Sequence, residues 1–156
     1  MKIGILREEK SPPDKRVLFT PNQCKWIIDN SNFDIYVQSS NIRCFSDKMY
    51  IQNGIQIVDD LSHCDILLGI KEVPKELLLP SKIYFYFSHT IKKQSYNRLL
   101  LSKMLDLNIQ MVDYEVLKND RNKRLLGLSL IHIRRCRRVV RCRCRGGPGG
   151  ERGGGG

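Results

Sequence analysis

Two short apolar runs, Asp65-Ile-Leu-Leu-Gly-Ile70 and Lys82-Ile-Tyr-Phe-Tyr-Phe87, decide the fold of this 156-residue chain. Both runs are almost continuously apolar and rich in residues that favour β-strands. That pattern is typical of strands buried on both faces of a sheet, which occur mainly in parallel sheets covered by helices. The two runs therefore predict a mostly parallel sheet at the centre of the chain.

The rest of the first 127 residues alternates predicted strands with predicted helices. Short apolar runs indicate strands, and apolar residues at helical spacing indicate helices. The other predicted strands are 2–6, 34–38, 55–58 and 109–114, and the predicted helices are 21–30, 47–52 and 95–107. This order predicts an α/β domain with a mostly parallel, Rossmann-like (flavodoxin-like) sheet and helices on both faces.

The first predicted helix has the clearest start signal. Thr20 supplies a capping hydroxyl, Pro21 suits the first helical position, and Gln23 completes a capping box. We expect Trp26 and Ile27 to lie on the inner face of this helix, where they would pack against the sheet.

Charge is distributed unevenly along the chain. Residues 128–156 hold eight of the 27 basic residues, one of the 16 acidic residues and eight of the 12 glycines, so they carry +7 of the net charge of +11. After Gly127 the residue types change abruptly to Arg, Gly and Cys. We therefore predict a globular domain over residues 1–127 and a disordered Arg/Gly-rich tail over residues 128–156.

The tail has the features of foreign sequence. Residues 128–133 (Leu-Ser-Leu-Ile-His-Ile) resemble one translated frame of a transposon-end adapter used in sequencing libraries, and residues 134–138 resemble its continuation. Residue types that GC-rich codons encode also replace the AT-rich types of the preceding domain. We predict that the tail is non-native adapter read-through, and that the high net charge says little about function.

Two functions of the tail stay open as alternatives. Its arginines would give salt-dependent affinity for phosphates, so the chain could be a non-catalytic nucleic-acid-binding protein. The tail has no aromatic residues on which bases could stack, and we expect no specific nucleic-acid partner. A zinc site could use His132, Cys136, Cys142 and Cys144, but their spacing matches no common zinc finger, and we expect no metal.

The cysteines and apolar runs of residues 1–127 favour a soluble protein in a reducing compartment. Cys24, Cys44 and Cys64 lie far apart without a CxxC pair, which suits reduced thiols better than disulfides. The N-terminus becomes charged too early for a signal peptide, and no apolar run approaches the roughly 20 residues that span a bilayer. We expect a cytoplasmic location and no association with a membrane.

Three predicted strands end in residues that suit chemistry on an amino or keto acid. Arg16 lies in the loop after the first strand, Lys71 follows the 65–70 strand, and His89 follows the 82–87 strand. A parallel sheet brings such ends to one edge, where ligands bind. A guanidinium binds a carboxylate through paired hydrogen bonds, and lysine and histidine can move protons. Each residue alone is more often a solvated charge or a cap, and it is their coincidence that predicts a site.

Three stretches resemble the N-terminal domain of the alanine dehydrogenase/pyridine nucleotide transhydrogenase superfamily. They are 16–21 (Arg-Val-Leu-Phe-Thr-Pro), 68–74 (Leu-Gly-Ile-Lys-Glu-Val-Pro) and 84–94 (Tyr-Phe-Tyr-Phe-Ser-His-Thr-Ile-Lys-Lys-Gln). Residues 87–94 followed by 109–115 are most similar to the saccharopine dehydrogenase and lysine-2-oxoglutarate reductase branch. The resemblance covers nearly all of residues 1–127, in order.

The resemblance implies roles for four residues. Arg16 would contact a substrate carboxylate, and Lys71 and His89 would act as acid–base catalysts. Arg43, in a stretch that resembles a loop beside the substrate, would also bind substrate. Members of the family interconvert an amino acid and a keto acid by hydride transfer through an imine with NAD or NADP. The implied substrates are lysine with 2-oxoglutarate or saccharopine, with alanine and pyruvate as second choice.

The cofactor of such an enzyme would be held mainly by a second, Rossmann-type domain. The chain has no GxGxxG fingerprint after a strand, and the glycine clusters of the tail do not lie between a strand and a helix. We therefore expect a fragment that ends before its nucleotide-binding domain and is inactive alone. A stand-alone substrate-binding module is the alternative, and the oligomeric state is left open.

Sequencing the locus again, from an amplicon prepared without transposon adapters, tests both expectations about the C-terminal part. We expect the genomic frame to leave the printed sequence after Gly127 and to continue into a domain with a GxGxxG-type loop. An uninterrupted frame through Arg145 would contradict the adapter origin. A frame with no nucleotide-binding domain would contradict the fragment interpretation.

Overall fold

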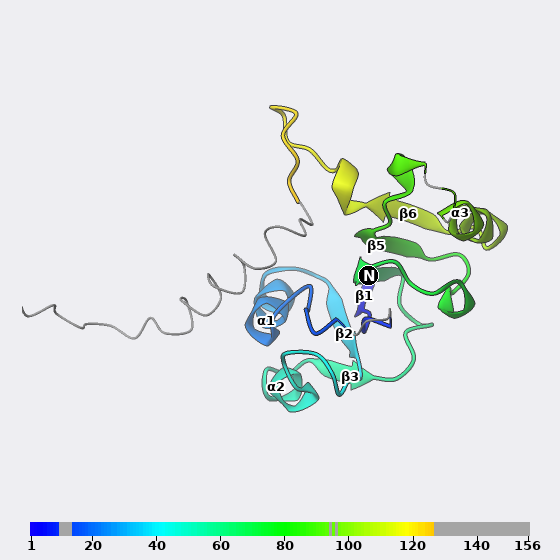
Figure 1. The fold of residues 1–156 in the computed structure, drawn as a ribbon. Coiled ribbons are helices and arrows are strands. Elements are labelled where there is room, and N and C mark those ends of the chain that lie inside the picture. Colours follow the sequence, from blue (N-terminus) through cyan, green and yellow to red (C-terminus); the bar gives the residue numbers. More distant parts are fainter. Residues whose placement is uncertain (10–13, 94, 96, 127–156) are drawn as a thin grey trace, which may run out of the picture. The chain divides into compact units, whose positions relative to one another are not determined.

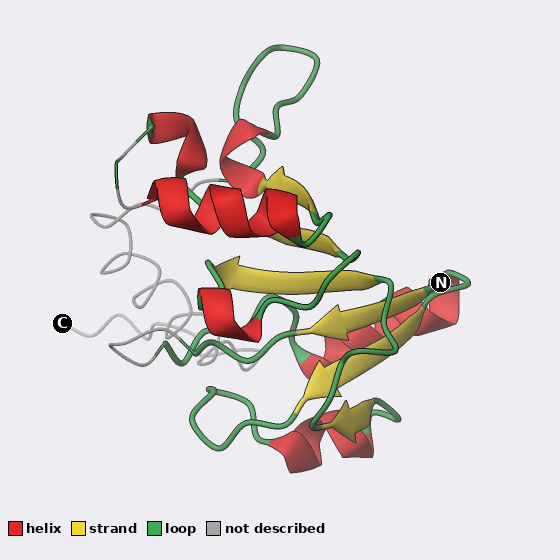
Figure 2. Ribbon diagram, turned by 90° about the vertical axis from the view of Figure 1, so that its right-hand side faces the viewer, coloured by secondary structure: helices red, strands yellow, loops and turns green. Residues whose placement is uncertain are grey.

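Six parallel strands form one sheet in the computed structural model, which describes residues 1–9, 14–93, 95 and 97–126 (Figure 1). The strand order is β3-β2-β1-β4-β5-β6, and each neighbouring pair is parallel, so the carboxyl ends lie at one edge (Figure 2). The strands are β1 (Lys2–Ile5), β2 (Asp34–Gln38), β3 (Gln56–Val58), β4 (Ile66–Lys71), β5 (Ile83–Phe87) and β6 (Gln110–Asp113). This confirms the predicted fold class.

Helices pack on both faces of the sheet. Figure 1 shows α1 (Pro21–Asn30) and α2 (Asp47–Gln52) on one side and α3 (Asn97–Asp106) on the other. Three short 3₁₀ helices follow strands or loops: η1 (Lys75–Leu77), η2 (Thr90–Lys92) and η3 (Tyr114–Val116). The predicted bounds of the two first helices agree with these positions, and the predicted helix 95–107 is slightly shorter in the structure.

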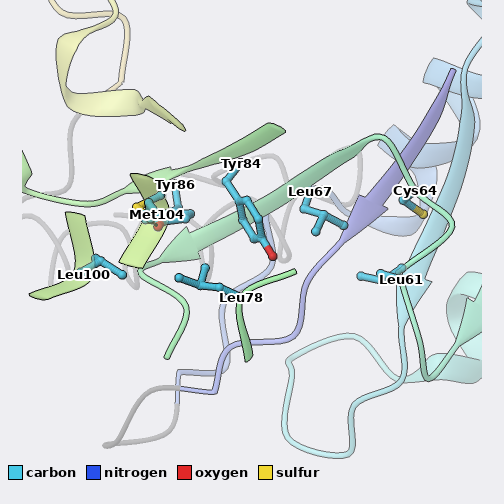
Figure 3. Packing of buried hydrophobic residues seen from close by; sticks show 8 residues of the cluster. All are labelled: Leu61, Cys64, Leu67, Leu78, Tyr84, Tyr86, Leu100 and Met104. Carbon is cyan, nitrogen blue, oxygen red and sulfur yellow. Dashed lines mark hydrogen bonds between the residues drawn. The ribbon is translucent and has the colours of Figure 1, made fainter. Parts of the chain in front are cut away.

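The core is divided between the two faces because neighbouring residues of a strand point in opposite directions. One cluster joins β1 and β2 to α1 and α2 through Ile5, Cys24, Ile35, Val37, Tyr50 and Ile55. The other joins β4 and β5 to α3, and its buried side chains are Leu61, Cys64, Leu67, Leu78, Tyr84, Tyr86, Leu100 and Met104 (Figure 3).

The start of α1 is as the sequence predicts, but its inner face is not. Thr20 and Gln23 form the reciprocal capping box, with Pro21 in the first turn. Trp26, however, is 66% exposed, whereas Cys24 is fully buried and Ile27 packs partly against the core. At 100° per residue Trp26 lies 200° from Cys24, so the helix buries the Cys24 side and turns the indole to solvent.

The predictions about the tail cannot be compared with the structure, whereas those about Cys24, Cys44 and Cys64 can. The predicted tail, its adapter origin and its zinc ligands lie outside the described residues. Within the described part, Cys24, Cys44 and Cys64 are free thiols, of which only Cys44 is exposed. No helix in that part is long and apolar enough to cross a bilayer.

The order of the strands places a crevice between β1 and β4. From β1 the chain moves outward through β2 to β3, and from β4 it moves in the other direction through β5 to β6. The connections after β1 and β4 therefore diverge to opposite faces. Such a switch point is where open α/β sheets bind ligands, beyond the carboxyl ends of the strands.

Where β1 pairs with β4, Leu61 and Leu67 leave little room for a side chain at position 4. A Cβ on Gly4 would lie 2.8 Å from Leu67 Cδ2 and 3.0 Å from Leu61 Cδ2, whereas a Cβ on Gly69 would meet its neighbours at 3.5 Å. We expect Gly4→Ala to lower the free energy of unfolding by about 1–3 kcal/mol through overpacking. Gly69→Ala, the matched control, should change it by less than about 1 kcal/mol.

Urea denaturation followed by far-ultraviolet circular dichroism measures both variants. Equal stability of the two alanine variants would show that the leucines beside Gly4 can move aside without cost.

Candidate functional site

Charged side chains gather at the crevice between β1 and β4. The chain leaves β1 through Glu8, β4 ends at Lys71, and the segment before α1 brings Asp14 and Arg16 to the same place. A cavity there is lined by Glu8, Asp14, Arg16, Ser40, Arg43 and Gly69, among others. Two of the predicted site residues, Arg16 and Lys71, thus meet at the switch point of the sheet.

Asp14 connects these two residues. Its carboxylate accepts hydrogen bonds from Arg16 Nε at 2.9 and 3.0 Å and from Arg16 Nη2 at 2.5 Å. The Lys71 Nζ lies 3.2 Å from Asp14 Oδ2. The Asp14 side chain is only 9% exposed. Hydrogen bonds from the Arg16 guanidinium are the main cause that holds the pKa of Asp14 well below its usual range. A carboxylate that stays ionised fixes the two cations beside each other.

Glu8 interacts with the backbone of β4. Its carboxylate accepts hydrogen bonds from the backbone N–H groups of Ile70, at 2.7 Å, and Lys71, at 3.0 Å. Burial raises the pKa of Glu8 above its usual range, and the two backbone donors oppose that effect. Glu8 therefore supports the strand end that carries Lys71.

Arg43 lies at the wall of the same cavity, with its guanidinium bound within the protein. Nη1 donates to the Gln38 carbonyl at 3.0 Å, Nε donates to the Phe45 carbonyl at 3.0 Å, and Nη2 pairs with the Asp47 carboxylate. The guanidinium also stacks over the Tyr50 ring, 4.5 Å from its centroid. These contacts stabilise the loop after β2, and a substrate contact of Arg43 stays a prediction.

His89 follows β5 and pairs with Glu115 rather than with the Asp14 cluster. Its Nδ1 lies 2.9 Å from Glu115 Oε2 and 3.1 Å from the Lys92 Nζ. Glu115 also pairs with Lys92 at 3.3 Å and with Arg124 at 3.4 Å. The hydrogen bond to His89 is the main cause that lowers the pKa of Glu115. Both contacts engage Nδ1, so Nε2 is the ring nitrogen that neither Glu115 nor Lys92 uses.

Buried polar groups fix the backbone of His89. Its φ of 56° is in the left-handed region, which residues other than glycine seldom adopt. Asn97 donates to the His89 carbonyl at 3.1 Å, and the buried Ser88 donates to Asp113 Oδ2 at 2.6 Å. Asp113 Oδ1 in turn accepts the Glu115 N–H at 2.8 Å. The same carboxylate thus joins the loops that carry His89 and Glu115.

The sequence reasoning located Lys71 and His89 correctly at strand ends but missed the acidic partners of the cations. Lys71 and Phe87 are neighbours in the register of β4 and β5, and His89 follows two residues after Phe87, so Lys71 and His89 belong to the same edge of the sheet. Asp14 was overlooked among the charges of its loop, although its position two residues before Arg16 could have suggested a pair. Glu8 and Glu115 also follow strands, and the sequence reasoning gave them no role.

The described residues do not provide a cradle for a dinucleotide or a metal. The segment between β1 and α1 contains no glycine, unlike a loop that binds pyrophosphate. In the part of the chain that the structure describes, no group of three or more His, Cys, Asp or Glu side chains could hold a metal ion.

Comparison with known families supports the predicted resemblance. Residues 4–132 match the family model described as alanine dehydrogenase/PNT, N-terminal domain. The chain belongs to this family. Two solved structures have the same fold: an L-alanine dehydrogenase, with a TM-score of 0.64 and 17% identity, and the transhydrogenase from Sinorhizobium meliloti, with a TM-score of 0.64 and 16% identity. The match with the alanine dehydrogenase covers 79% of this chain and 35% of that protein, and the match with the transhydrogenase covers 78% and 37%.

Curated relatives with higher identity carry the names of two kinds of enzyme. The alpha-aminoadipic semialdehyde synthase of Arabidopsis thaliana is 39% identical over 132 residues, which cover 81% of this chain and 12% of that protein. The mitochondrial enzyme of the same name from Bos taurus is 35% identical and covered to 14%. The saccharopine dehydrogenase [NAD(+), L-lysine-forming] of Schizosaccharomyces pombe is 31% identical over 126 residues, which cover 77% of this chain and 34% of that protein. The chain therefore spans between an eighth and a third of these relatives.

Replacing Asp14 by Asn tests its role in coupling the two cations. We expect Asp14→Asn to lower the free energy of unfolding by about 1.5–3 kcal/mol, because charge-assisted hydrogen bonds are lost. The pKa of Asp14 is lowered in the folded protein. Its contribution is therefore complete above the unfolded pKa of about 4 and disappears as the pH falls below it, so the two proteins should converge in acid.

Urea denaturation at a series of pH values gives the measurement. Asp29→Asn is the matched control, since Asp29 pairs with Lys25 on the surface with about half of each side chain exposed, and such pairs contribute little. A difference between wild type and Asp14→Asn that stays constant from neutral to acid pH would refute the coupling.

Proposed function

We propose that this chain is the substrate-binding part of an NAD(P)-dependent amino-acid dehydrogenase that acts on CH–NH groups by hydride transfer through an imine. Within this proposal the substrates are lysine with 2-oxoglutarate, or saccharopine, with alanine and pyruvate as the second choice. The proposed location is the cytoplasm. The activity belongs to a longer protein, because relatives that carry enzyme names extend far beyond the matched region.

The observation that carries the proposal is the coupling of Arg16 and Lys71 through Asp14 at the switch point. A guanidinium can hold the carboxylate of a keto acid in a fixed orientation. An ammonium beside it can then deliver a proton to the oxygen of the keto group. The names of some relatives support lysine and saccharopine over alanine, since the saccharopine dehydrogenases [NAD(+), L-lysine-forming] are 28–31% identical, whereas the L-alanine dehydrogenase is 17% identical.

The chemistry of imine formation needs the proton transfers that these side chains can perform. When an amine nitrogen adds to a keto carbon, the nitrogen loses a proton and the carbonyl oxygen gains one. Loss of water from the resulting carbinolamine needs a second proton on that oxygen. We assign these transfers to Lys71 Nζ and His89 Nε2, with Arg16 holding the carboxylate next to the keto group.

The hydride itself would come from the nicotinamide. The described residues offer no glycine-rich loop for its pyrophosphate, so in this proposal the cofactor is held by a domain that this chain does not include. Imine formation and its reversal are the steps for which this chain supplies side chains.

Expression of the protein encoded by the extended reading frame tests the proposal. We expect NADH or NADPH oxidation that depends on both lysine and 2-oxoglutarate. Lys71→Gln should lower kcat about 10²–10⁴-fold, in line with the loss of an acid–base group. Arg16→Lys should instead raise the KM for the keto acid, because the paired hydrogen bonds to its carboxylate are lost.

Lys75→Gln, four residues beyond Lys71 in η1, is the matched control and should keep both constants. Activity with pyruvate and ammonia but not with lysine would select the second choice of substrates. Full activity of Lys71→Gln would disprove the assigned role.

A further inference from the structure

We propose that Glu8 is a positioning residue, which places the Lys71 ammonium for proton transfer by holding the end of β4. This inference rests on the proposed function, in which Lys71 is a proton-transfer group. It adds a residue that does not itself touch the reacting atoms.

The first argument is the local geometry of β4. In a regular strand, consecutive N–H groups point to opposite sides, so one neighbour cannot bind both. Here the register between β4 and β5 shifts between Leu68 and Lys71. Both carboxylate oxygens of Glu8 are engaged, Oε1 with the Ile70 N–H at 2.7 Å and Oε2 with the Lys71 N–H at 3.0 Å. The side chain therefore stabilises an irregular strand end that the sheet alone does not.

The second argument is that β1 has already ended at this level. The Leu6 N–H donates to the Leu68 carbonyl at 2.9 Å, which is backbone pairing between the two strands. Two residues after Leu6, beyond the end of β1, the Glu8 side chain provides the acceptors in place of the backbone. The Glu8 carboxylate thus continues the hydrogen bonding of β1 to β4 as far as Lys71.

The third argument is that Lys71 is held both at its backbone and at its side-chain nitrogen. Glu8 binds its backbone N–H, and Asp14 lies 3.2 Å from its Nζ. Asp14 also binds Arg16, so Asp14 determines the position of the ammonium relative to the guanidinium. When Arg16 binds the carboxylate of a keto acid, that relative position determines where the Lys71 ammonium lies with respect to the keto group.

Burial of the Glu8 carboxylate has an energetic cost. Burial raises the pKa of Glu8 in the folded protein, so its ionised form is disfavoured there. A raised folded pKa means that stability falls as the pH rises from the unfolded to the folded pKa. The ionised carboxylate therefore carries a cost of burial, and the hydrogen bonds from the Ile70 and Lys71 N–H groups oppose that cost.

Amide exchange in the 156-residue chain tests the contact without any activity. We expect Glu8→Gln to accelerate exchange of the Ile70 or Lys71 amide about tenfold or more in ¹⁵N-resolved NMR spectra, because a glutamine has one acceptor oxygen for two donors. Glu9→Gln is the matched control: Glu9 is the next residue, pairs with Arg7, and is a third exposed. It should leave both amides unchanged.

Kinetics of the longer protein test the positioning role. We expect Glu8→Gln to lower kcat at least tenfold while the KM for the keto acid stays within about twofold, since Arg16 is unchanged. The pH profile of kcat should also shift, because Lys71 would no longer be held in place. Glu9→Gln should match wild type in kcat, KM and pH profile.

The outcomes separate the two proposals. Unchanged exchange of both amides in Glu8→Gln would overturn the contact, and faster exchange with normal kcat would overturn the positioning role. A rise in KM equal to the fall in kcat/KM would also overturn it, since that result indicates lost binding. If the wild-type longer protein does not oxidise NAD(P)H with any of the proposed substrates, the proposed function and the positioning role fall together, whereas the exchange result still decides the contact.

Discussion

The parallel pairing of β1 with β4 is the constraint on which the rest of the site depends. These strands are neighbours in the sheet but are separated in the chain by two helices and two strands, so their connections diverge to opposite faces. The divergence creates the crevice, and the missing side chain at Gly4 lets the two strands and Leu61 pack together. Loops from both halves of the sheet can then place charges beside each other.

Three carboxylates organise the cations at this edge, each in a different environment. Asp14 stays ionised because it is enclosed by a guanidinium and an ammonium, whereas burial works against ionisation of Glu8. Glu115 is surrounded by His89, Lys92 and Arg124. Environments that shift pKa values in opposite directions are typical of sites that move protons. The arrangement is therefore compatible with the acid–base roles that we propose for Lys71 and His89.

Much of the fold could be predicted because its signals are local. The apolar runs of β4 and β5, the capping box at Thr20 and the helical spacing of Leu100 and Met104 depend on residues close together in sequence. The inner face of α1 depends on how the helix meets the sheet, which is why the exposed position of Trp26 was missed. For the site, strand ends located Lys71 and His89, but the pairs Asp14–Lys71 and His89–Glu115 join residues 57 and 26 positions apart. The Arg43–Asp47 pair, at a spacing of four, was within reach of the sequence.

The exposed position of Trp26 has a practical consequence for spectroscopy. It is the single tryptophan of the chain, and its indole is already largely in water in the folded state. Its fluorescence emission will therefore change little when the core comes apart. The buried tyrosines Tyr50, Tyr84 and Tyr86 lie within the two core clusters and lose their surroundings on unfolding. Tyrosine absorbance, rather than tryptophan emission, is the intrinsic optical signal that reports on the core of this protein.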